Sequence, residues 1–494
     1  MKVLFVVSNL FFSEPLGALQ LSAVCKKRGD TVRLISLRQH SVNLVLREFE
    51  PDVVAYSATS PDEYLFQEAD EIVMRWKEQT GKRVLRIMGG PHPTFFPEVL
   101  DKMSLDAICI GDGDFAIHHA LNAFEAGKDL DGIPNIATPS HRNPSKEIVS
   151  DLDSLPFADR DVFYEAAPDL IKVGIRGFMS RRGCPHKCTY CFNHAYNRMF
   201  KGDGRKIMRR RSVDSFLEEI KCVVRDYPKV KFLRFADDVF AIFADEWLLE
   251  FAERYPKEVG IPFYCYVRPN NMSDDIARLL AKAGCLHVGM AVESGVEKIR
   301  NDVMKRNMSD DVLRRAFDQA HRHGILTSGN TIIATPGSTI EDDYNSFLFT
   351  RSLRLTFPSF GIFMPFPKTE LTDYAISIGV LEPDFNYRNL RPSLPSAMNN
   401  YTDSDRRFQQ NLVFLGAIFC FLPDFMLPIL KLLLRTRLTF LFKPLGTAFT
   451  TWRMSKVFPN AYPTDPVVFF KSLVNAFRHF AATPTKQVNI NRSA

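Results

Sequence analysis

The sequence has few cysteines for its length, nine among 494 residues, and three of these fall within eight positions. So sparse and uneven a set argues against the disulfide framework of a small secreted protein and indicates a reducing compartment with a bound metal. The opening residues 1–12 also lack a small-residue cleavage site, and Asn9 interrupts their apolar run. We therefore expect a first β-strand there instead of a signal peptide, and a cytoplasmic protein.

Residues 1–407 lack any excess of positive charge and are slightly acidic, although the whole chain carries a net charge of +6. This balance gives no support for nucleic-acid binding by the main body of the protein. Residues 408–494 differ, because they contain ten Lys and Arg but only two acidic residues, Asp424 and Asp465. A tail that is both basic and apolar indicates a surface partner.

An apolar content of 46% with 24% charged residues describes a folded protein, and 494 residues exceed what a single core holds. Residues 1–135 alternate buried β-branched runs with helical stretches that end in glycine. The candidate strands lie at 2–7, 31–37, 52–58, 83–90 and 106–114. This pattern predicts an α/β fold with a doubly wound, Rossmann-like sheet, whose ligands lie beyond the carboxyl ends of the strands.

A second alternating series follows a Pro-, Ser- and charge-rich segment, 136–172, which reads as a linker. Within residues 173–375 the candidate strands lie at 177–184, 231–238, 262–269, 287–294, 326–335 and 359–367. Six β–α units predict a full or partial (β/α)6 barrel of TIM type, with its chemistry at the carboxyl ends of the strands. Residues 376–494 are predicted to be mainly helical.

Three thiols at C-x-x-x-C-x-x-C spacing lie just past the first barrel strand: Cys184, Cys188 and Cys191. A cubane iron–sulfur cluster normally takes four thiolates, so three would leave one iron open for a substrate or cosubstrate. A structural zinc site is the alternative, with His186 or His194 as its fourth ligand. The glycine and aromatic residues around the loop, and its place after a barrel strand, favour the cluster. The other six cysteines read as core residues.

The stretch "GCPHKCTYCFN" resembles the cluster motif of the radical S-adenosylmethionine (SAM) enzymes. The resemblance implies a 4Fe-4S cluster on the three thiols, SAM bound to the open iron, and cleavage of SAM to a 5′-deoxyadenosyl radical. It also implies that Tyr190 packs near the adenine, that Asp237 and Asp238 approach the SAM amino group, and that Glu293 faces the ribose. On the residue types alone, these three carboxylates are also compatible with helix capping or surface solvation.

One barrel segment departs from the family's pattern. "TIIATPGST" resembles the fifth-strand G-x-P-G-E-T segment of these enzymes, but Ala334 replaces the glycine and Ser338 the glutamate. The resemblance names no residue that acts directly on the substrate, so the catalytic residues stay unassigned.

The first domain resembles the cobalamin-binding domain of the class B radical SAM methylases, and with the barrel the resemblance covers residues 1–375. Small, hydroxylic and glycine residues follow the strands at the positions where a macrocycle or its phosphate tail would approach the backbone. The implied cobalamin-binding residues are Ser57, Thr59, Ser60, Gly89, Gly90, His92 and Thr94.

The chain lacks the D-x-H-x-x-G motif whose histidine ligates cobalt in cobalamin mutases. The loop after the first strand reads "SNLFFSEPLG" and contains no histidine. Bound cobalamin would therefore have no protein histidine at cobalt from this loop. His92 lies between two prolines, and a turn histidine with a structural hydrogen bond is the simpler interpretation of it.

The resemblance implies a cobalamin-dependent radical SAM enzyme that methylates an unactivated carbon of a hydrophobic small molecule, such as a lipid, isoprenoid or tetrapyrrole. The alternatives are an oxidative cyclase that resembles the anaerobic Mg-protoporphyrin ester cyclase, and a non-catalytic cobalamin carrier or sensor. A methylthiotransferase is disfavoured, because the first domain lacks three cysteines for a second cluster. The expected partners are the substrate and an electron donor, either a reductase or a flavodoxin or ferredoxin.

Residues 411–442 form an apolar stretch long enough to cross a bilayer. Pro423, Asp424 and Pro428 interrupt it, however, and basic residues follow directly. We expect a helical cap on the barrel, and association with a membrane surface is the alternative.

Overall fold

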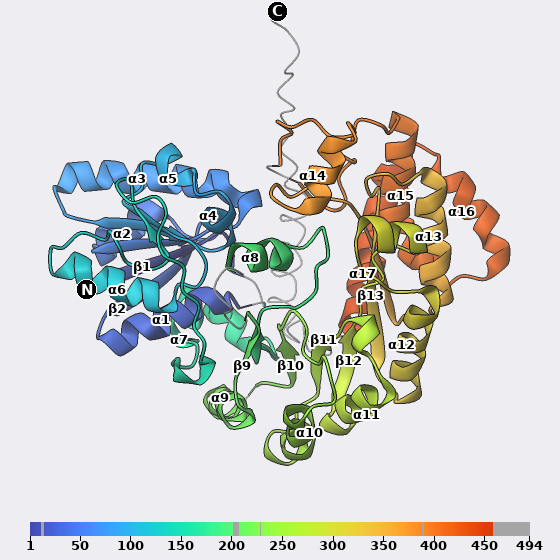
Figure 1. Ribbon diagram of the computed structural model, residues 1–494, viewed down its shortest axis with the longest axis horizontal. Helices are drawn as coiled ribbons and strands as arrows, with labels where there is room; N and C mark the ends of the chain where they lie inside the picture. The colour runs from blue at the N-terminus through green and yellow to red at the C-terminus, as the bar shows by residue number, and fades with distance from the viewer. Residues whose placement is uncertain (11–13, 201–206, 228, 388–389, 458–494) are drawn as a thin grey trace, which may run out of the picture.

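The computed structural model describes residues 1–10, 14–200, 207–227, 229–387 and 390–457 and contains two mainly parallel sheets that lie side by side (Figure 1). The first sheet has the order β2-β1-β3-β4-β5-β6, and only β6 is antiparallel to its neighbour. Its strands are β1 Lys2–Val7, β2 Thr31–Ser36, β3 Val53–Ser57, β4 Leu85–Gly89, β5 Ala107–Cys109 and β6 Ile136–Ala137. The predicted doubly wound sheet is confirmed.

Helices cover both faces of this sheet, which explains why its strands are apolar on both sides. On one face α1 (Leu16–Arg28) and α6 (Asp114–Glu125) enclose a core with β1, and on the other face α2 (Val42–Phe49) and α3 (Glu63–Thr80) enclose a second core. Two short helices, α4 (Pro91–Phe95) and α5 (Val99–Lys102), lie between β4 and β5.

The segment that reads as a linker packs against the first sheet. It contributes β6 at the sheet edge, a 3-10 turn η2 (Leu152–Ser154), helix α7 (Asp161–Ala166) and a second 3-10 turn η3 (Pro168–Lys172). Val162, Phe163 and Tyr164 of α7 belong to the core that α1 and α6 enclose. This segment therefore carries the chain to the second sheet along the surface of the first.

The second sheet has six parallel strands in the order β14-β13-β12-β11-β10-β7. Its two edge strands, β7 and β14, do not pair with each other in the described residues, so the sheet is a partial barrel. Its strands are β7 Ile175–Phe178, β10 Phe232–Phe235, β11 Phe263–Tyr266, β12 Cys285–Gly289, β13 Leu326–Ile333 and β14 Phe357–Ile362. Its main outer helices are α9 Val213–Asp226, α10 Glu246–Glu258, α11 Asp274–Ala283, α12 Asp310–Arg322 and α13 Ile340–Ser352.

The single strand expected over residues 177–184 is wrong. β7 ends at Phe178, and Arg181–Arg182 (β8) instead form a small antiparallel ladder with Arg209–Arg210 (β9). The chain leaves the sheet because the Ser180 hydroxyl donates a hydrogen bond to Asp237, just past the end of β10 (2.9 Å). The thiols consequently follow this ladder and not a barrel strand directly.

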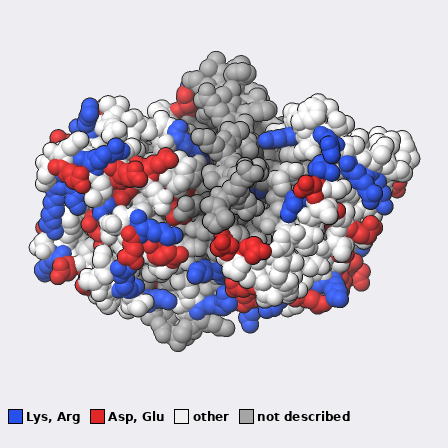
Figure 2. All heavy atoms as spheres, turned by 90° about the horizontal axis from the view of Figure 1, so that it is seen from above, with Lys and Arg blue, Asp and Glu red and all other residues white. Residues whose placement is uncertain are grey.

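The C-terminal region is helical, as predicted, up to Val457, where the described residues end. The helices of this part are α14 Glu370–Ser377, α15 Asp403–Phe419, η7 Asp424–Met426, α16 Leu427–Leu434 and α17 Thr439–Val457. Helix α15 packs on β14 and α13, on the side of the second sheet away from the first (Figure 1). Among the described residues, no helix combines the length and apolar character needed to cross a membrane. Basic and acidic side chains are interspersed over the face seen in Figure 2.

Candidate functional site

The three clustered thiols lie on the loop between β8 and helix α8 (Phe192–Phe200). Cys184 and Cys188 are buried and Cys191 is partly buried. Burial raises the pKa of the Cys184 thiol and raises that of Cys191 to about 12. The Arg268 guanidinium donates a hydrogen bond to Cys188 Sγ (2.8 Å). Thiols that burial keeps protonated become ligands when a metal centre offsets their charge, and Arg268 adds further positive charge beside an anionic cluster.

The two histidines proposed as a fourth zinc ligand have other partners. His186 Nε2 contacts Asn271 Oδ1 (3.1 Å), and His194 Nε2 contacts Glu370 Oε1 (2.9 Å). No group of three or more His, Cys, Asp or Glu side chains in the described residues converges on a single metal ion. A cubane needs a different arrangement, since each thiolate binds its own iron, so the loop fits a cluster with one open iron better than it fits zinc.

A buried triad of Tyr190, Glu293 and Arg306 lies beside the thiol loop. Arg306 Nη1 donates to the Tyr190 hydroxyl (2.6 Å), which donates in turn to Glu293 Oε1 (2.8 Å). Arg306 Nη1 is also 3.3 Å from Glu293 Oε1. The pKa of Glu293 is raised, because the effect of burial outweighs the opposite effect of the Arg306 charge. Two residues implied by the resemblance therefore contact each other directly, and an arginine that the sequence did not identify binds both.

Glu293 has a left-handed backbone, with φ of 64°. It lies beyond the end of β12, where its main chain bridges to Thr331 of β13. Left-handed φ is unfavourable for a residue with a side chain, so the contacts of the carboxylate help to hold this conformation.

The two aspartates predicted near the SAM amino group lie in different surroundings. Asp237 is only 1% exposed, accepts the hydrogen bond from Ser180 and has its pKa raised to about 6 by burial. Asp238 is exposed. The pKa values of the Cys184 and Cys191 thiols are raised mainly by burial. The negative charge of Asp238 raises them further, so its carboxylate lies near both thiols. Asp237 thus supports the turn that leads to the thiols, and Asp238 lies close to the thiols themselves.

The segment at the end of β13 that departs from the family pattern, residues 331–339, is hydrogen-bonded to a buried carboxylate, that of Asp343. Ala334 has a left-handed backbone (φ 55°), and its N–H donates to Asp343 Oδ1 of α13 (2.8 Å). Gln409 of α15 donates to Asp343 Oδ2 (2.9 Å), and the Tyr401 hydroxyl donates to the Ser338 carbonyl (3.0 Å). The C-terminal region therefore fixes the end of β13.

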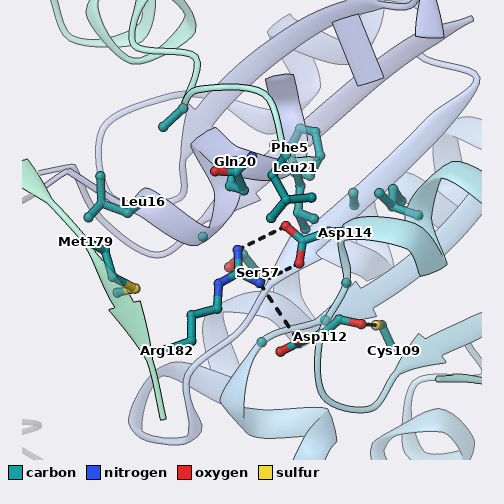
Figure 3. Close-up of a pocket in the computed structure, with 18 of the residues that line it drawn as sticks. Phe5, Leu16, Gln20, Leu21, Ser57, Cys109, Asp112, Asp114, Met179 and Arg182 are labelled. Atoms are coloured by element: carbon teal, nitrogen blue, oxygen red, sulfur yellow. Dashed lines mark hydrogen bonds and ion pairs between the residues drawn. The ribbon is translucent and has the colours of Figure 1, made fainter. Parts of the chain in front are cut away.

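A cavity of about 330 Å³ opens at the carboxyl edge of the first sheet, between α1, α6 and the 152–158 segment (Figure 3). Apolar side chains form most of its wall, including Phe5, Leu16 and Leu21. Glycines lie where the strands end, and Gly90 is the clearest case. Its φ is 96°, and a Cβ there would lie 2.8 Å from the carbonyl oxygen of Ala58. A long, largely apolar group that approaches the backbone fits this cavity.

The predicted cobalamin residues divide into two groups. Ser57, Gly89 and Gly90 line the cavity. The others do not line it: Thr59, Ser60, His92 and Thr94. His92 is buried, stacks on Phe96 and contacts the Ser60 hydroxyl (3.2 Å), as expected for a structural turn histidine. Thr94 accepts from the Gly111 N–H (3.1 Å) and so supports the next strand-end loop.

No histidine is among the described residues that line the cavity, and the loop after β1 makes a different contact. Glu14 Oε2 of that loop accepts the Gly177 N–H of β7 (2.6 Å), and its Oε1 pairs with Arg160 (2.6 Å). Where cobalamin mutases carry a cobalt ligand, this chain uses the loop to bind the first strand of the second sheet.

Sequence reasoning also missed the residues that join the cavity to the thiol loop. Arg182 lies two positions before Cys184, and its guanidinium binds both carboxylate oxygens of Asp114 in the cavity wall (2.6 and 3.0 Å; Figure 3). The Tyr196 hydroxyl of α8 donates to Asp112 Oδ1 (3.1 Å), and Asp112 also pairs with Arg209 of β9. The sequence contained one sign of this contact, the acidic stretch "GDGD" (111–114) after β5. Its two aspartates pair with the arginines of the β8–β9 ladder.

Comparisons with known proteins agree with this arrangement. Residues 3–121 match the B12 binding domain and residues 180–348 match the radical SAM superfamily. An uncharacterized methyltransferase of Pyrococcus horikoshii is 25% identical over 74% of this chain and 79% of its own. The anaerobic magnesium-protoporphyrin IX monomethyl ester cyclase of Cereibacter sphaeroides is 23% identical over 74% of this chain and 60% of its own.

Solved structures share the fold. The radical SAM methyltransferase TsrM of Kitasatospora setae, with cobalamin and a [4Fe-4S] cluster bound, superposes with a TM-score of 0.65. The superposition covers 85% of this chain and 89% of TsrM, at 15% identity.

Proposed function

This chain is a radical SAM enzyme with a B12-binding domain, and we propose that it methylates an unactivated carbon of a hydrophobic small molecule. Its cofactors are a 4Fe-4S cluster, SAM and cobalamin. When bound, the cluster supplies the electron that cleaves SAM, and cobalamin carries the methyl group. The Pyrococcus horikoshii relative and TsrM support methylation by the activity for which they are named, whereas the Cereibacter sphaeroides relative is named for the alternative, the cyclase.

The observation that carries the proposal is how closely the two candidate cofactor sites adjoin. Arg182 pairs with Asp114 in the wall of the first-sheet cavity, and only Gly183 separates it from Cys184. A carbon radical and a methyl donor must meet at near-attack distance, so both cofactors have to face one shared space. Two separate domains with independent sites would not need such a joint.

We assign each residue a role from its contacts. Cys184, Cys188 and Cys191 hold the cluster, and Arg268 donates a hydrogen bond to the Cys188 sulfur. Glu293 and Tyr190 bind SAM and are oriented by Arg306. The cavity takes the cobalamin tail along Ser57, Gly89 and Gly90.

The substrate class is inferred from the C-terminal region, whose exposed apolar side chains suit contact with lipids, isoprenoids or tetrapyrroles. Such compounds partition into membranes, so we also propose that the enzyme works at a membrane surface. The electron comes from an external donor, a reductase or a flavodoxin or ferredoxin.

The decisive experiment uses the anaerobically purified and reconstituted protein. Metal analysis and the absorption spectrum should give about four irons and one cobalamin per chain. Incubation with SAM and a reductant should then yield both S-adenosylhomocysteine and 5′-deoxyadenosine. Deoxyadenosine alone would contradict methylation and favour the cyclase. Bound cobalamin with neither product would favour a carrier or sensor, and stoichiometric zinc without iron would overturn the radical chemistry itself.

A further inference from the structure

Large apolar side chains are exposed on the last helices in a concentration found nowhere else in the described residues. Phe425, Leu432 and Phe440 are 76, 70 and 69% exposed. The other exposed large apolar residues between 421 and 455 are Phe421, Ile429, Leu438, Leu441, Leu445 and Trp452. Single exposed apolar residues are ordinary, but so many on consecutive helices indicate a binding surface.

Helix α16 shows the pattern most clearly, because it is apolar on both sides. Leu430 and Leu434 are fully buried in the core that α15 forms with β13 and β14. Ile429 and Leu432 of α16 lie on the opposite, exposed side, and Phe425 of the preceding turn η7 is exposed as well. Apolar side chains on both the buried and the exposed side of a helix indicate a second partner for the exposed side.

The turn from α16 to α17 continues this surface and is held rigidly. The Asn411 side-chain amide of α15 donates to the carbonyls of Leu434 (3.1 Å) and Thr436 (3.0 Å). Its Oδ1 accepts from the Thr439 hydroxyl (2.7 Å). Leu438, Phe440 and Leu441 therefore project from a fixed turn, so little conformational entropy is lost when they are covered.

Cations of the same segment accompany these residues. Lys431, Arg435 and Arg437 are exposed and lie between Leu432 and Leu438 or directly beside them in the chain. Asp424 is the one acidic residue between positions 421 and 455, and it pairs with Arg351. A symmetric contact with a second copy would place these cations near their own counterparts, at a cost in repulsion. An anionic bilayer instead accepts both the apolar side chains and the cations.

We propose that the exposed face formed by η7, α16, the α16–α17 turn and the start of α17 docks on the surface of an anionic lipid bilayer. Phe425, Leu432 and Phe440 enter the boundary between headgroups and acyl chains, and Arg435 and Arg437 contact lipid phosphates. The Lys431 ammonium lies over the Tyr344 ring of the protein (4.5 Å) and adds positive charge to this face. The docking rests on this face alone, and it does not depend on the reaction proposed above.

The test is flotation of the full-length protein with vesicles of phosphatidylcholine alone and of phosphatidylcholine mixed with phosphatidylglycerol. We expect binding to the mixed vesicles and not to the neutral ones, with a loss of binding as salt is raised. Leu432→Asp and Phe440→Asp should each weaken binding by roughly tenfold or more, since a buried leucine-sized side chain contributes that much. Arg435→Gln should weaken it by roughly fivefold.

Leu44→Asp is the matched control, because Leu44 is 56% exposed on α2 of the first domain and should leave binding unchanged. Unaltered iron and cobalamin contents show that each variant folds. Equal binding to neutral and anionic vesicles, or none to either, would overturn the proposal. So would a wild-type dimer in light scattering that Leu432→Asp converts to a monomer, since the face would then bind a second copy. The products formed from SAM test the proposed reaction separately, so a failure of the docking proposal and a failure of the proposed reaction can be told apart.

Discussion

The carboxyl edges of the two sheets meet the same backbone requirement in different ways. At the first sheet, glycines occupy the left-handed positions Gly90 and Gly111, and a Cβ at either would come within 3 Å of another residue. At the second sheet two left-handed positions carry side chains, Glu293 and Ala334, and the left-handed glycine after them, Gly337, has room for a Cβ. The first edge is therefore shaped by the absence of side chains, and the second by side chains that hold the main chain in place.

This difference suits what each edge has to bind. A cavity bounded by glycines and apolar residues admits a large preformed cofactor without demanding precise polar contacts. A network such as Arg306, Tyr190 and Glu293 fixes the orientation of a few polar atoms and excludes water around them. The first edge contributes space and the second contributes alignment, and variants at each should fail in different ways.

The largest effect is expected from Cys184→Ala, which should separate the two edges completely. Removal of one of three thiolates should abolish the cluster and with it all 5′-deoxyadenosine formation, while cobalamin binding to the first sheet persists. Iron analysis and the visible spectrum of the same sample measure both. Cys222→Ala, a partly buried thiol on α9, is the matched control and should keep both cofactors. Loss of cobalamin together with iron would show that the two edges do not bind independently.

Arg306→Met should damage the second edge by a different route. It leaves the Glu293 carboxylate buried without its cation, which costs about 3 to 5 kcal/mol of unfolding free energy. Urea unfolding measures this loss, and the double variant Arg306→Met with Glu293→Gln should recover most of it because no charge is then left unpaired. SAM affinity should fall in both variants. A single variant as stable as the wild type would show that the pair contributes alignment without stability.

Gly90→Ala tests the first edge. A methyl group would meet the Ala58 carbonyl in a strained left-handed conformation, so we expect a loss of about 2 kcal/mol and weaker cobalamin binding. Gly127→Ala is the control, since its φ of 68° is also left-handed but no atom lies within 4 Å of the new Cβ. The difference between the two variants isolates the steric part. Equal losses of stability in the two variants would mean that the left-handed backbone alone, and not the contact with Ala58, requires glycine at position 90.

The most gradual effect, about 1 kcal/mol for each pH unit, concerns Asp343, which supports Ala334. Burial raises the pKa of its carboxyl from 3.8 to about 7, so the folded protein retains a proton that the unfolded chain releases near pH 4. Stability should therefore fall as pH rises from about 4 to about 7, by about 1 kcal/mol per pH unit, and level off above. Asp343→Asn should flatten this slope in thermal or urea unfolding measured across that range. An unchanged slope would assign it to other groups.

The sequence predicted the features that depend on neighbouring residues. Runs buried on both faces located the strands, and the spacing of Cys184, Cys188 and Cys191 located the loop between β8 and α8. It could not find Arg268 or Arg306, because their partners Cys188 and Tyr190 lie 80 and 116 positions away. No local pattern signals a contact at that separation.

Adjacent residues also received the same prediction where the structure separates them. Asp237 and Asp238 follow β10 together, but successive side chains of an extended chain point to opposite sides. Asp237 therefore bonds to Ser180 beneath the turn while Asp238 is exposed. The chain direction beyond β3 and β4 likewise turns Thr59, Ser60, His92 and Thr94 away from the cavity, which sequence position alone could not indicate.

The joint between β8, α8 and the "GDGD" loop has a consequence for how such proteins are recombined. Arg182 and Tyr196 come from the thiol-bearing segment, and Asp114 and Asp112 come from the first sheet. A chimera that takes its first sheet from one relative and its barrel from another inherits only half of each pair. Neither domain can therefore be exchanged by itself. A functional chimera has to take the acidic loop (111–114) and the β8–β9 arginine ladder from the same parent protein.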